Sequence, residues 1–478
     1  MRFDDTKLTR GELLAAGAAG LVALHAVRPP RARGAGSTVR QFVSRPDLKP
    51  PVVTVLRQRP GTARGHLFVA PSSGPGQRGA MIVDDSGELV WFRPVEGRAV
   101  TDFKVSVYHG RPVLTWWEGK VVDGLGQGEW VVVDASYREL ARFSAARGLD
   151  ADLHEFVVTP ENTALVTSTE TVTWDLRPLG GSRHGRVVGG VVQELALPSG
   201  RLLHEWRSLD HVPVTETAIR AKPGPRFDYF HVNSIDLDAD GDLIVSARNT
   251  WAAYKIDRRS GRVRWRLGGK RSDFTLGHGA RFYWQHDVRS HAHDLVTVFD
   301  NGAAPAEEPQ SRALLLRLDL RARHASLVRA DVHRPERVLS HFMGNAQLLA
   351  DGHVLVGWGG SPYVTEFAAD GSIVYDARLP HGGESYRAFR FPWTAQPAGA
   401  PRLAFTGDAL YASWNGSTET ASWQLLEGRS AADLRPTQTV PRRGFETVLR
   451  PASGSRYAAV AALDAAAAPL GRSESIAL

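Results

Sequence analysis

The chain has 478 residues, a formal net charge of +7 and no cysteine. The absence of cysteine excludes disulfides, thiolate zinc sites and a cysteine nucleophile. The basic residues are scattered rather than gathered in one segment, which argues against a nucleic-acid partner. No apolar run of about 18 residues lies in the body of the chain, so we expect no stable membrane span in the mature protein.

The N-terminal residues predict export. Lys7 and Arg10 precede the apolar run from Leu13 to Val27, which fits a signal-peptide core. Thr9–Leu14 resembles a twin-arginine signal with Gly11 in place of the second arginine, so a degenerate twin-arginine route and a Sec route both stay open. We assign residues 1–38 to an export signal or leader, with an uncleaved anchor as the alternative. Export would place the protein in the cell envelope or outside the cell.

The composition favours an all-β fold, with 47 Gly, 28 Pro and 13 Trp. Short turn sequences between alternating apolar runs are strong hairpin signals, because Gly accepts a positive φ without steric cost. Four hairpins are clearest, and they are Ile235–Ser246 around Asp240-Gly241, Ile256–Trp265 around Ser260-Gly261, Gln347–Trp358 around Asp351-Gly352 and Phe367–Tyr375 around Asp370-Gly371.

The strands recur in units that are each expected to contain four strands. The units lie at about 64–92, 101–145, 154–206, 231–267, 286–328 and 341–378. A period of about fifty residues built from strands is typical of a β-propeller. We therefore predict a six-bladed propeller over 64–394, with seven blades as the alternative, preceded by an extended linker or edge segment over 39–63.

The last part of the chain predicts a second domain. Alternating strands are expected in Ala409–Trp414, Ser422–Glu427, Phe445–Leu449 and Arg456–Leu463. An early Trp, a late Tyr and an Ala-Leu-Asp sequence before the last strand are similar to a fibronectin type III domain. We expect a fibronectin type III-like β-sandwich over 395–478.

Polar residues recur where successive units begin. His154, His231 and His286 open the third, fourth and fifth units, and Asn345 holds the comparable place in the sixth. The first strand of each propeller blade lines the central channel, so equivalent positions converge near one axis. We expect these residues, with Asn233, to form one polar funnel. Arg248 could add a fixed positive charge there.

Several stretches together resemble the arylsulfotransferase family, in the branch common among actinobacteria. The resemblance covers roughly residues 41–478. The segments that carry it are Phe230–Asn249, Trp251–Gly269, Trp284–Asp287, Phe299–Gly302, Gly344–Asn345, Ser385–Trp393 and Trp414–Gly416. Some exported members contain a cysteine pair, which this chain lacks.

The resemblance implies a propeller enzyme that moves a sulfuryl group from an aryl sulfate ester to a phenol. It implies no nucleotide sulfate donor, and we expect no cofactor and no metal. His286 would be the nucleophile that becomes sulfurylated, and His154 would donate or accept a proton. His231, Asn233 and Arg248 would hold the sulfuryl oxygens.

We also assign Asn345 and Trp117 to substrate binding. Two other functions remain open at this point. One is a non-catalytic propeller that binds glycans or other ligands, because one scaffold hosts many functions. The other is a metal-dependent hydrolase that uses the same histidines as ligands. The oligomeric state is not predicted.

Overall fold

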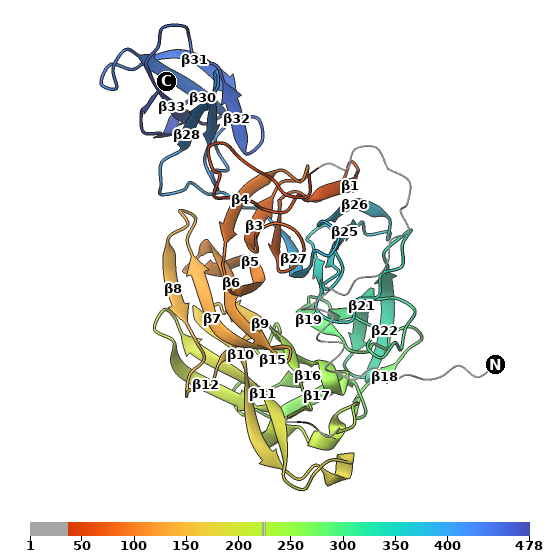
Figure 1. Cartoon of the computed structure of the whole chain (residues 1–478). Coiled ribbons are helices and arrows are strands. Elements are labelled where there is room, and N and C mark those ends of the chain that lie inside the picture. Colours follow the sequence, from red (N-terminus) through yellow and green to blue (C-terminus); the bar gives the residue numbers. More distant parts are fainter. Residues whose placement is uncertain (1–36, 222–223, 225) are drawn as a thin grey trace, which may run out of the picture.

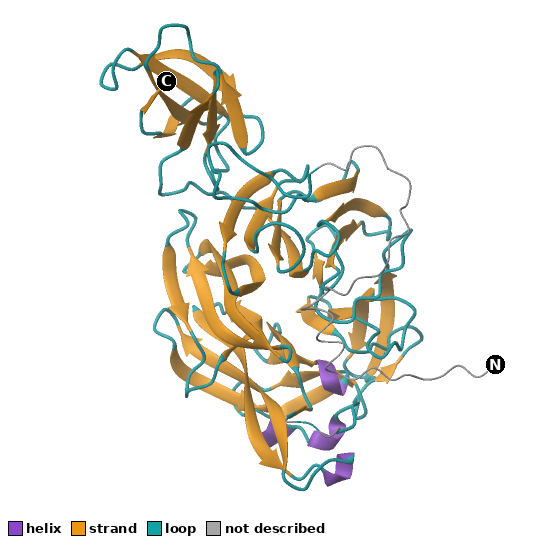
Figure 2. Ribbon diagram, viewed as in Figure 1, coloured by secondary structure: helices purple, strands orange, loops and turns teal. Residues whose placement is uncertain are grey.

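The computed structural model describes residues 37–221, 224 and 226–478. The predicted export signal falls almost entirely on residues 1–36, outside this part. Five sheets surround a central axis, and two more form the C-terminal part (Figures 1 and 2). The short helices are η1 (Arg177–Leu179), α2 (Ser208–His211), η2 (Val214–Glu216) and η3 (Arg248–Thr250). Among the described residues, no helix has the length and apolar character needed to cross a membrane.

The five sheets contain six four-stranded blades, as predicted, because one nine-stranded sheet holds two of them. The first three blades, from the axis outward, are β27 (Ser385–Phe391), β2 (His66–Pro71), β3 (Gly79–Val83) and β4 (Leu89–Pro94); β5 (Ala99–Tyr108), β6 (Arg111–Val122), β7 (Leu125–Val133) and β8 (Glu139–Phe143); and β9 (Ala151–Val158), β10 (Thr163–Trp174), β11 (Gly185–Ala196) and β12 (Arg201–Arg207).

The other three blades follow the same order from the axis. They are β14 (Val232–Leu237), β15 (Leu243–Ala247), β16 (Ala252–Ile256) and β17 (Val263–Gly268); β19 (His286–His291), β20 (Leu295–Asp300), β21 (Arg312–Asp319) and β22 (His324–Asp331); and β23 (Asn345–Leu348), β24 (Val354–Gly357), β25 (Tyr363–Phe367) and β26 (Ile373–Arg378). Three short strands extend these sheets: β1 (Thr54–Gln58) on β26, β13 (Phe227–Asp228) on β11 and β18 (Thr275–Leu276) on β22. The predicted linker 39–63 therefore contains an edge strand.

The four predicted hairpins are all present. Gly241 joins β14 to β15 with a φ of 81°, and Gly352 joins β23 to β24 with a φ of 80°. Gly261 and Gly371 have the same left-handed conformation between their strands. Glycine adopts this conformation without a Cβ clash, so local turn chemistry alone fixes these strand pairs.

The expectation that residues 64–92 form a complete four-stranded unit is wrong. This segment supplies only β2, β3 and β4, and the inner strand of its blade is β27, from the other end of the propeller. Strands β2 and β27 pair antiparallel from His66 opposite Phe391 to Pro71 opposite Ser385. The backbone hydrogen bonds of this shared blade join the two ends of the propeller and close the ring.

Residues after the propeller form two sheets that share a core. One contains β28 (Arg402–Thr406), β29 (Ala409–Ser413) and β32 (Glu446–Leu449), and the other contains β30 (Ser422–Gly428), β31 (Arg435–Pro441), β33 (Tyr457–Leu463), β34 (Pro469–Arg472) and β35 (Ile476–Ala477). Leu410, Leu425 and Val460 pack in this core. Asn415 connects it to the first blade by bonding the backbone N–H and C=O of Phe92, both at 2.9 Å. The fibronectin type III likeness stays a prediction.

Aromatic side chains fill the interfaces between neighbouring blades. Trp116 of β6 is fully buried against Phe103 of β5, with ring centroids 6.0 Å apart, and against Trp91 of β4, at 6.3 Å. Phe68 of β2 belongs to the same cluster. The first two blades are therefore joined by apolar packing, which is the main stabilising term at such an interface.

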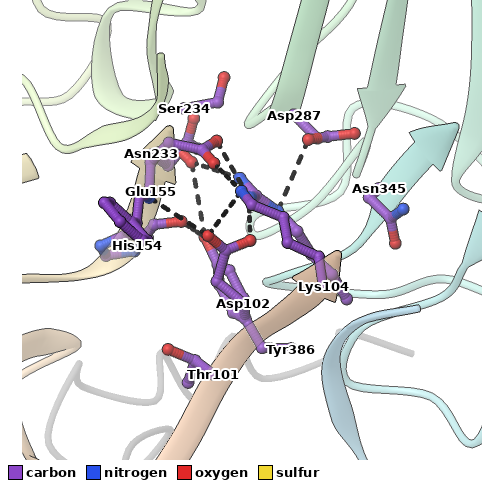
Figure 3. A network of polar contacts seen from close by, with 12 residues as sticks. Thr101, Asp102, Lys104, His154, Glu155, Asn233, Ser234, Asp287, Asn345 and Tyr386 are labelled. Atoms are coloured by element: carbon purple, nitrogen blue, oxygen red, sulfur yellow. Dashed lines mark hydrogen bonds and ion pairs between the residues drawn. The ribbon is translucent and has the colours of Figure 1, made fainter. Parts of the chain in front are cut away.

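Charged side chains close the axis itself (Figure 3). The Arg387 side chain on β27 is fully buried, and its Nη1 binds Asp102 at 2.6 Å and Glu155 at 3.0 Å. Its Nη2 donates to the carbonyl of Asn233 at 2.9 Å, and its Nε lies 3.5 Å from Asp287. One guanidinium thus contacts the inner strands of four other blades.

Lys104 and Arg289 complete this axial ion cluster. Lys104 binds Asp102 at 2.8 Å and Glu155 at 2.5 Å, and Arg289 binds Asp287 at 2.6 Å and also Glu155. Three cations therefore face three carboxylates. Burial alone would raise the pKa of Glu155, but Arg289, Arg387 and Lys104 together lower it well below its ordinary value.

We expect Trp116→Ala to lower the free energy of unfolding by about 3–5 kcal/mol, because it leaves a large cavity between two blades. Trp174→Ala is the matched control. Trp174 is 40% exposed, and its loss should cost about 0.5 kcal/mol or less. Urea unfolding followed by tryptophan fluorescence measures both. Equal losses in the two variants would contradict the packing described here.

Arg387→Met should cost about 3–5 kcal/mol, because it removes one of the three cations that compensate the buried carboxylates of Asp102, Glu155 and Asp287. Arg435→Met is the control, since Arg435 is 80% exposed and pairs with Asp433 at the surface. That change should cost about 1 kcal/mol or less. Circular dichroism in urea compares them, and an unchanged midpoint for Arg387→Met would show that the cluster does not hold the ring together.

Candidate functional site

Three histidines meet near the axis, next to the ion cluster. His154 lies on β9, His231 directly precedes β14 and His286 opens β19. The ring centroids of His154 and His231 are 4.9 Å apart, and those of His154 and His286 are 6.5 Å apart. His154 and Asn233 lie close to the buried carboxylates in Figure 3. The structure thus brings together residues that are far apart in the sequence.

Each histidine uses its Nδ1 on a polar partner. Nδ1 of His154 lies 2.5 Å from Asp152, and Nδ1 of His231 lies 2.6 Å from Asp228. Nδ1 of His286 instead lies 2.7 Å from the Asn301 amide oxygen. A carboxylate partner stabilises an imidazolium, whereas a neutral amide does so only weakly. The imidazolium form is therefore stabilised by a carboxylate at His154 and His231, but only by an amide oxygen at His286.

The electrostatic surroundings keep His286 neutral. Burial lowers the pKa of His286 well below its ordinary value of 6.5, and the positive charges near it, led by Arg248, lower it further. Burial also lowers the pKa of His231, although Asp228 opposes this shift. A neutral imidazole keeps a lone pair on one ring nitrogen, so His286 can act as a nucleophile or ligand near pH 7.

Arg248 supplies the positive charge at this site. It follows β15 as the first residue of η3, and its guanidinium carbon lies 4.7 Å from the ring centroid of Trp284. Its Nη2 donates to the carbonyl of His341 at 3.1 Å. The stacking on Trp284 and this bond hold the guanidinium in one orientation, which suits recognition of an anionic group.

Asn233 connects two inner strands beneath the histidines. Its side chain is fully buried, and its Nδ2 donates to the carbonyl of Gln285, the residue before His286, at 2.7 Å. Within the described part of the chain, its Oδ1 has no hydrogen-bond partner. The amide therefore holds His286 in place through the backbone, and its one free atom is an acceptor.

Asn345 and Trp117 are engaged by the protein backbone. Asn345 donates to the Ala388 carbonyl at 2.7 Å and accepts from the Ala388 N–H at 2.9 Å, so it ties β23 to the closing strand. Trp117 is fully buried and donates from its indole to Ala151 at 2.9 Å. Both side chains have structural partners, and their predicted contact with substrate stays a prediction.

The partners of the three histidines were not among the predicted site residues. Asp152 lies two residues before His154, and this spacing places both side chains on one face of β9. That spacing was a usable signal. Asn301 falls in the Phe299–Gly302 segment that carries the family resemblance, but no local spacing links it or the loop Ser340–Gly344 to His286, because they approach that ring only in the folded propeller. The backbone N–H of Met343 in this loop lies 3.3 Å from Nε2 of His286.

Two cavities lie away from the histidines. One, of about 250 Å³, is lined by Lys104, Ser106, Asp236, Arg289 and apolar side chains. The other, of about 510 Å³, lies between the second blade and the C-terminal sheets, beside Trp414. The described residues contain no cluster of three or more His, Asp or Glu arranged to hold a metal ion.

Solved structures that resemble this one differ strongly in sequence. A protein of unknown function from Bacteroides caccae is 15% identical, with a TM-score of 0.43, and the match covers 68% of this chain and 98% of that one. A catalytically inactive virginiamycin B lyase from Staphylococcus aureus, crystallised with quinupristin, is 10% identical, with a TM-score of 0.37, covering 76% and 96%.

A search of curated proteins gives no match to this chain. A family model does match, however. The model described as Arylsulfotransferase (ASST) matches residues 104–379, more than half of the chain. The match includes His154, His231, Arg248 and His286. The chain belongs to the arylsulfotransferase family.

Proposed function

We propose that this protein transfers a sulfuryl group from an aryl sulfate ester to a phenol, through a covalent intermediate on Nε2 of His286. Membership of the family supports an aryl sulfotransferase activity. The observation that carries the mechanism is the buried neutral imidazole of His286 beside Arg248 and two carboxylate-paired histidines. This arrangement combines a nucleophile, an anion-binding cation and groups that can move a proton.

In the first step, Nε2 attacks sulfur, the bond from sulfur to the aryl oxygen breaks and an aryloxide leaves. Arg248 stabilises the charge on the sulfuryl oxygens. His154 supplies a proton to the aryloxide, and Asp152, 2.5 Å from Nδ1, orients the ring for this transfer. His231 and Asn233 lie around the transferred group in this proposal, with Asp228 orienting His231.

In the second step, an acceptor phenol gives its proton to His154 and attacks sulfur. The bond from Nε2 to sulfur breaks, which returns His286 to its starting form. No residue changes its oxidation state, and the protons balance over the two steps. The reaction needs no nucleotide donor in this scheme. We also propose, from the apolar Leu13–Val27 run alone, that the protein acts outside the cytoplasm.

His286→Ala should abolish covalent labelling, because Nε2 of His286 is the atom that forms the bond to sulfur in this scheme. Intact-mass analysis after mixing the protein with nitrophenyl sulfate alone tests this. The wild type should gain one sulfuryl group that maps to His286 and disappears on addition of phenol. His184→Ala, at an exposed histidine, should label like the wild type. Turnover by His286→Ala at the wild-type rate would refute the scheme.

Arg248→Met should lower the labelling rate about 100-fold or more, the usual effect of losing one well-placed charge donor. The stem of methionine keeps the contact with Trp284 while removing the charge. Stopped-flow release of nitrophenolate measures the rate. Arg259→Met, which changes an exposed arginine in the β16–β17 turn, is the control. Equal rates for the two variants would exclude Arg248 from the site.

The labelling rate should stay constant as the pH falls from 8 through 6.5. The pKa of His286 is lowered, so the ring stays neutral and nucleophilic above that lowered value and loses activity only when the pH falls through it. The pH dependence of the single-turnover rate, measured with a nitrophenyl donor, checks this. An acid limb centred at or above 6.5 would contradict the electrostatic description of the site.

A further inference from the structure

Asn301 lies between His286 and the loop Ser340–Gly344, and its side chain has three partners. Its Nδ2 donates to the carbonyl oxygens of Ser340 and Met343, both at 2.9 Å. Its Oδ1 lies 2.7 Å from Nδ1 of His286. Carbonyl oxygens only accept hydrogen bonds, so the amide nitrogen must face the loop and the amide oxygen must face His286.

We propose that Asn301 is a positioning residue that keeps His286 in the tautomer with its proton on Nδ1 and its lone pair on Nε2. This inference deepens the proposed function and rests on it. An amide oxygen carries no hydrogen, so its short contact with Nδ1 is favourable only when Nδ1 carries the proton. The N–H of Met343, 3.3 Å from Nε2, is a second and independent indication, because it needs an acceptor at that atom.

The tautomer controls both halves of the reaction. The lone pair on Nε2 forms the bond to sulfur in the first half. The sulfurylated ring then still has its proton on Nδ1 and carries a positive charge, which the Asn301 oxygen stabilises. In the second half, this ring leaves sulfur as a neutral imidazole. A ring that had lost the Nδ1 proton would have to leave as an anion, which is a much poorer leaving group.

The site requires an amide at this position. His286 needs an acceptor, and the loop carbonyls need two donors, a combination that asparagine supplies from one planar group. Asn301→Asp would keep the acceptor but would place a carboxylate oxygen against the carbonyls of Ser340 and Met343. Asn301→Leu would keep the shape and remove all three bonds. The two variants therefore separate control of the tautomer from support of the loop.

NMR of the full-length protein with isotope-labelled histidine reads the tautomer directly, because the nitrogen shifts differ between protonated and bare ring nitrogens. The chain has 17 histidines, and the His286 signals are those that His286→Ala removes. Without substrate, we expect the proton on Nδ1 in the wild type and in Asn301→Asp, and a mixture of tautomers in Asn301→Leu. A wild-type His286 with its proton on Nε2 would overturn the proposal.

The activity of the same variants provides a second readout. Asn301→Leu should slow sulfuryl transfer from the labelled protein to phenol about 10- to 100-fold, the range known for outer partners of metal-binding histidines. Asn301→Asp should move the acid limb of labelling to higher pH, since a carboxylate stabilises the imidazolium. Asn415→Leu is the matched control, because Asn415 also brackets a backbone segment, at Phe92, away from the histidines.

Asn301→Leu with an unchanged tautomer and an unchanged transfer rate would also overturn the proposal. If Asn301→Leu does not fold, the spectra of the wild type and of Asn301→Asp still show whether the proton of His286 is on Nδ1. If the wild type neither takes up nor transfers a sulfuryl group, the proposed function fails. The NMR measurement is made without substrate, so it decides the role of Asn301 separately.

Discussion

The contacts of the Arg387 guanidinium are the interaction on which the rest of the structure depends. Arg387 lies on the strand that closes the ring, and it binds groups from the second, third, fourth and fifth blades. Apolar packing holds each pair of neighbouring blades together, but it cannot fix all the inner strands relative to one another. A buried cation shared by several carboxylates does so, because any displacement would leave a charge without its partner.

The histidine site follows from this constraint. His154 is next to Glu155 and His286 is next to Asp287, so these two histidines are each one residue away from the axial ion cluster, and His231 lies two residues before Asn233, whose carbonyl binds Arg387. Tyr386, the neighbour of Arg387, donates to the carbonyl of His154 at 3.2 Å and packs against its ring at 5.8 Å. The same inner strands thus carry the axial ion cluster, in which the charges are paired, and the histidines beside it. The rigidity of the first determines the geometry of the second.

The parts of the fold that depend on local chemistry could be predicted from the sequence. Gly241 and Gly352 identify hairpins because a positive φ is a property of a single residue. The recurring spacing predicted the correct number of blades, and it also predicted that the three histidines lie close together. The closing strand could not be read in this way, since the pairing of β2 with β27 has no local signal. The role of Asn301 is also non-local, because its partners come from two different blades.

Residue type alone did not separate structural from chemical roles. Asn233 and Asn345 have similar positions at the start of inner strands, yet Asn345 has both ends of its amide bound to Ala388. Trp117 was a plausible aromatic contact for a substrate, but Gly119 and Gly128 leave room for its ring inside the second blade. Only the three-dimensional arrangement shows which polar atoms are already used.

The closing strand also has a consequence for the order in which the protein matures. Ala70 of the first blade bonds Ser385, a residue 315 positions later in the chain. Such a long separation makes this contact slow to form, and the ribosome must have completed almost the whole propeller before it becomes possible. Until then, Asp102 and Glu155 share only Lys104, and the guanidinium that joins the inner strands of four other blades is missing. A nascent chain that has not yet reached β27 therefore cannot close the ring or complete the axial ion cluster, whereas the C-terminal sheets are not needed for either step.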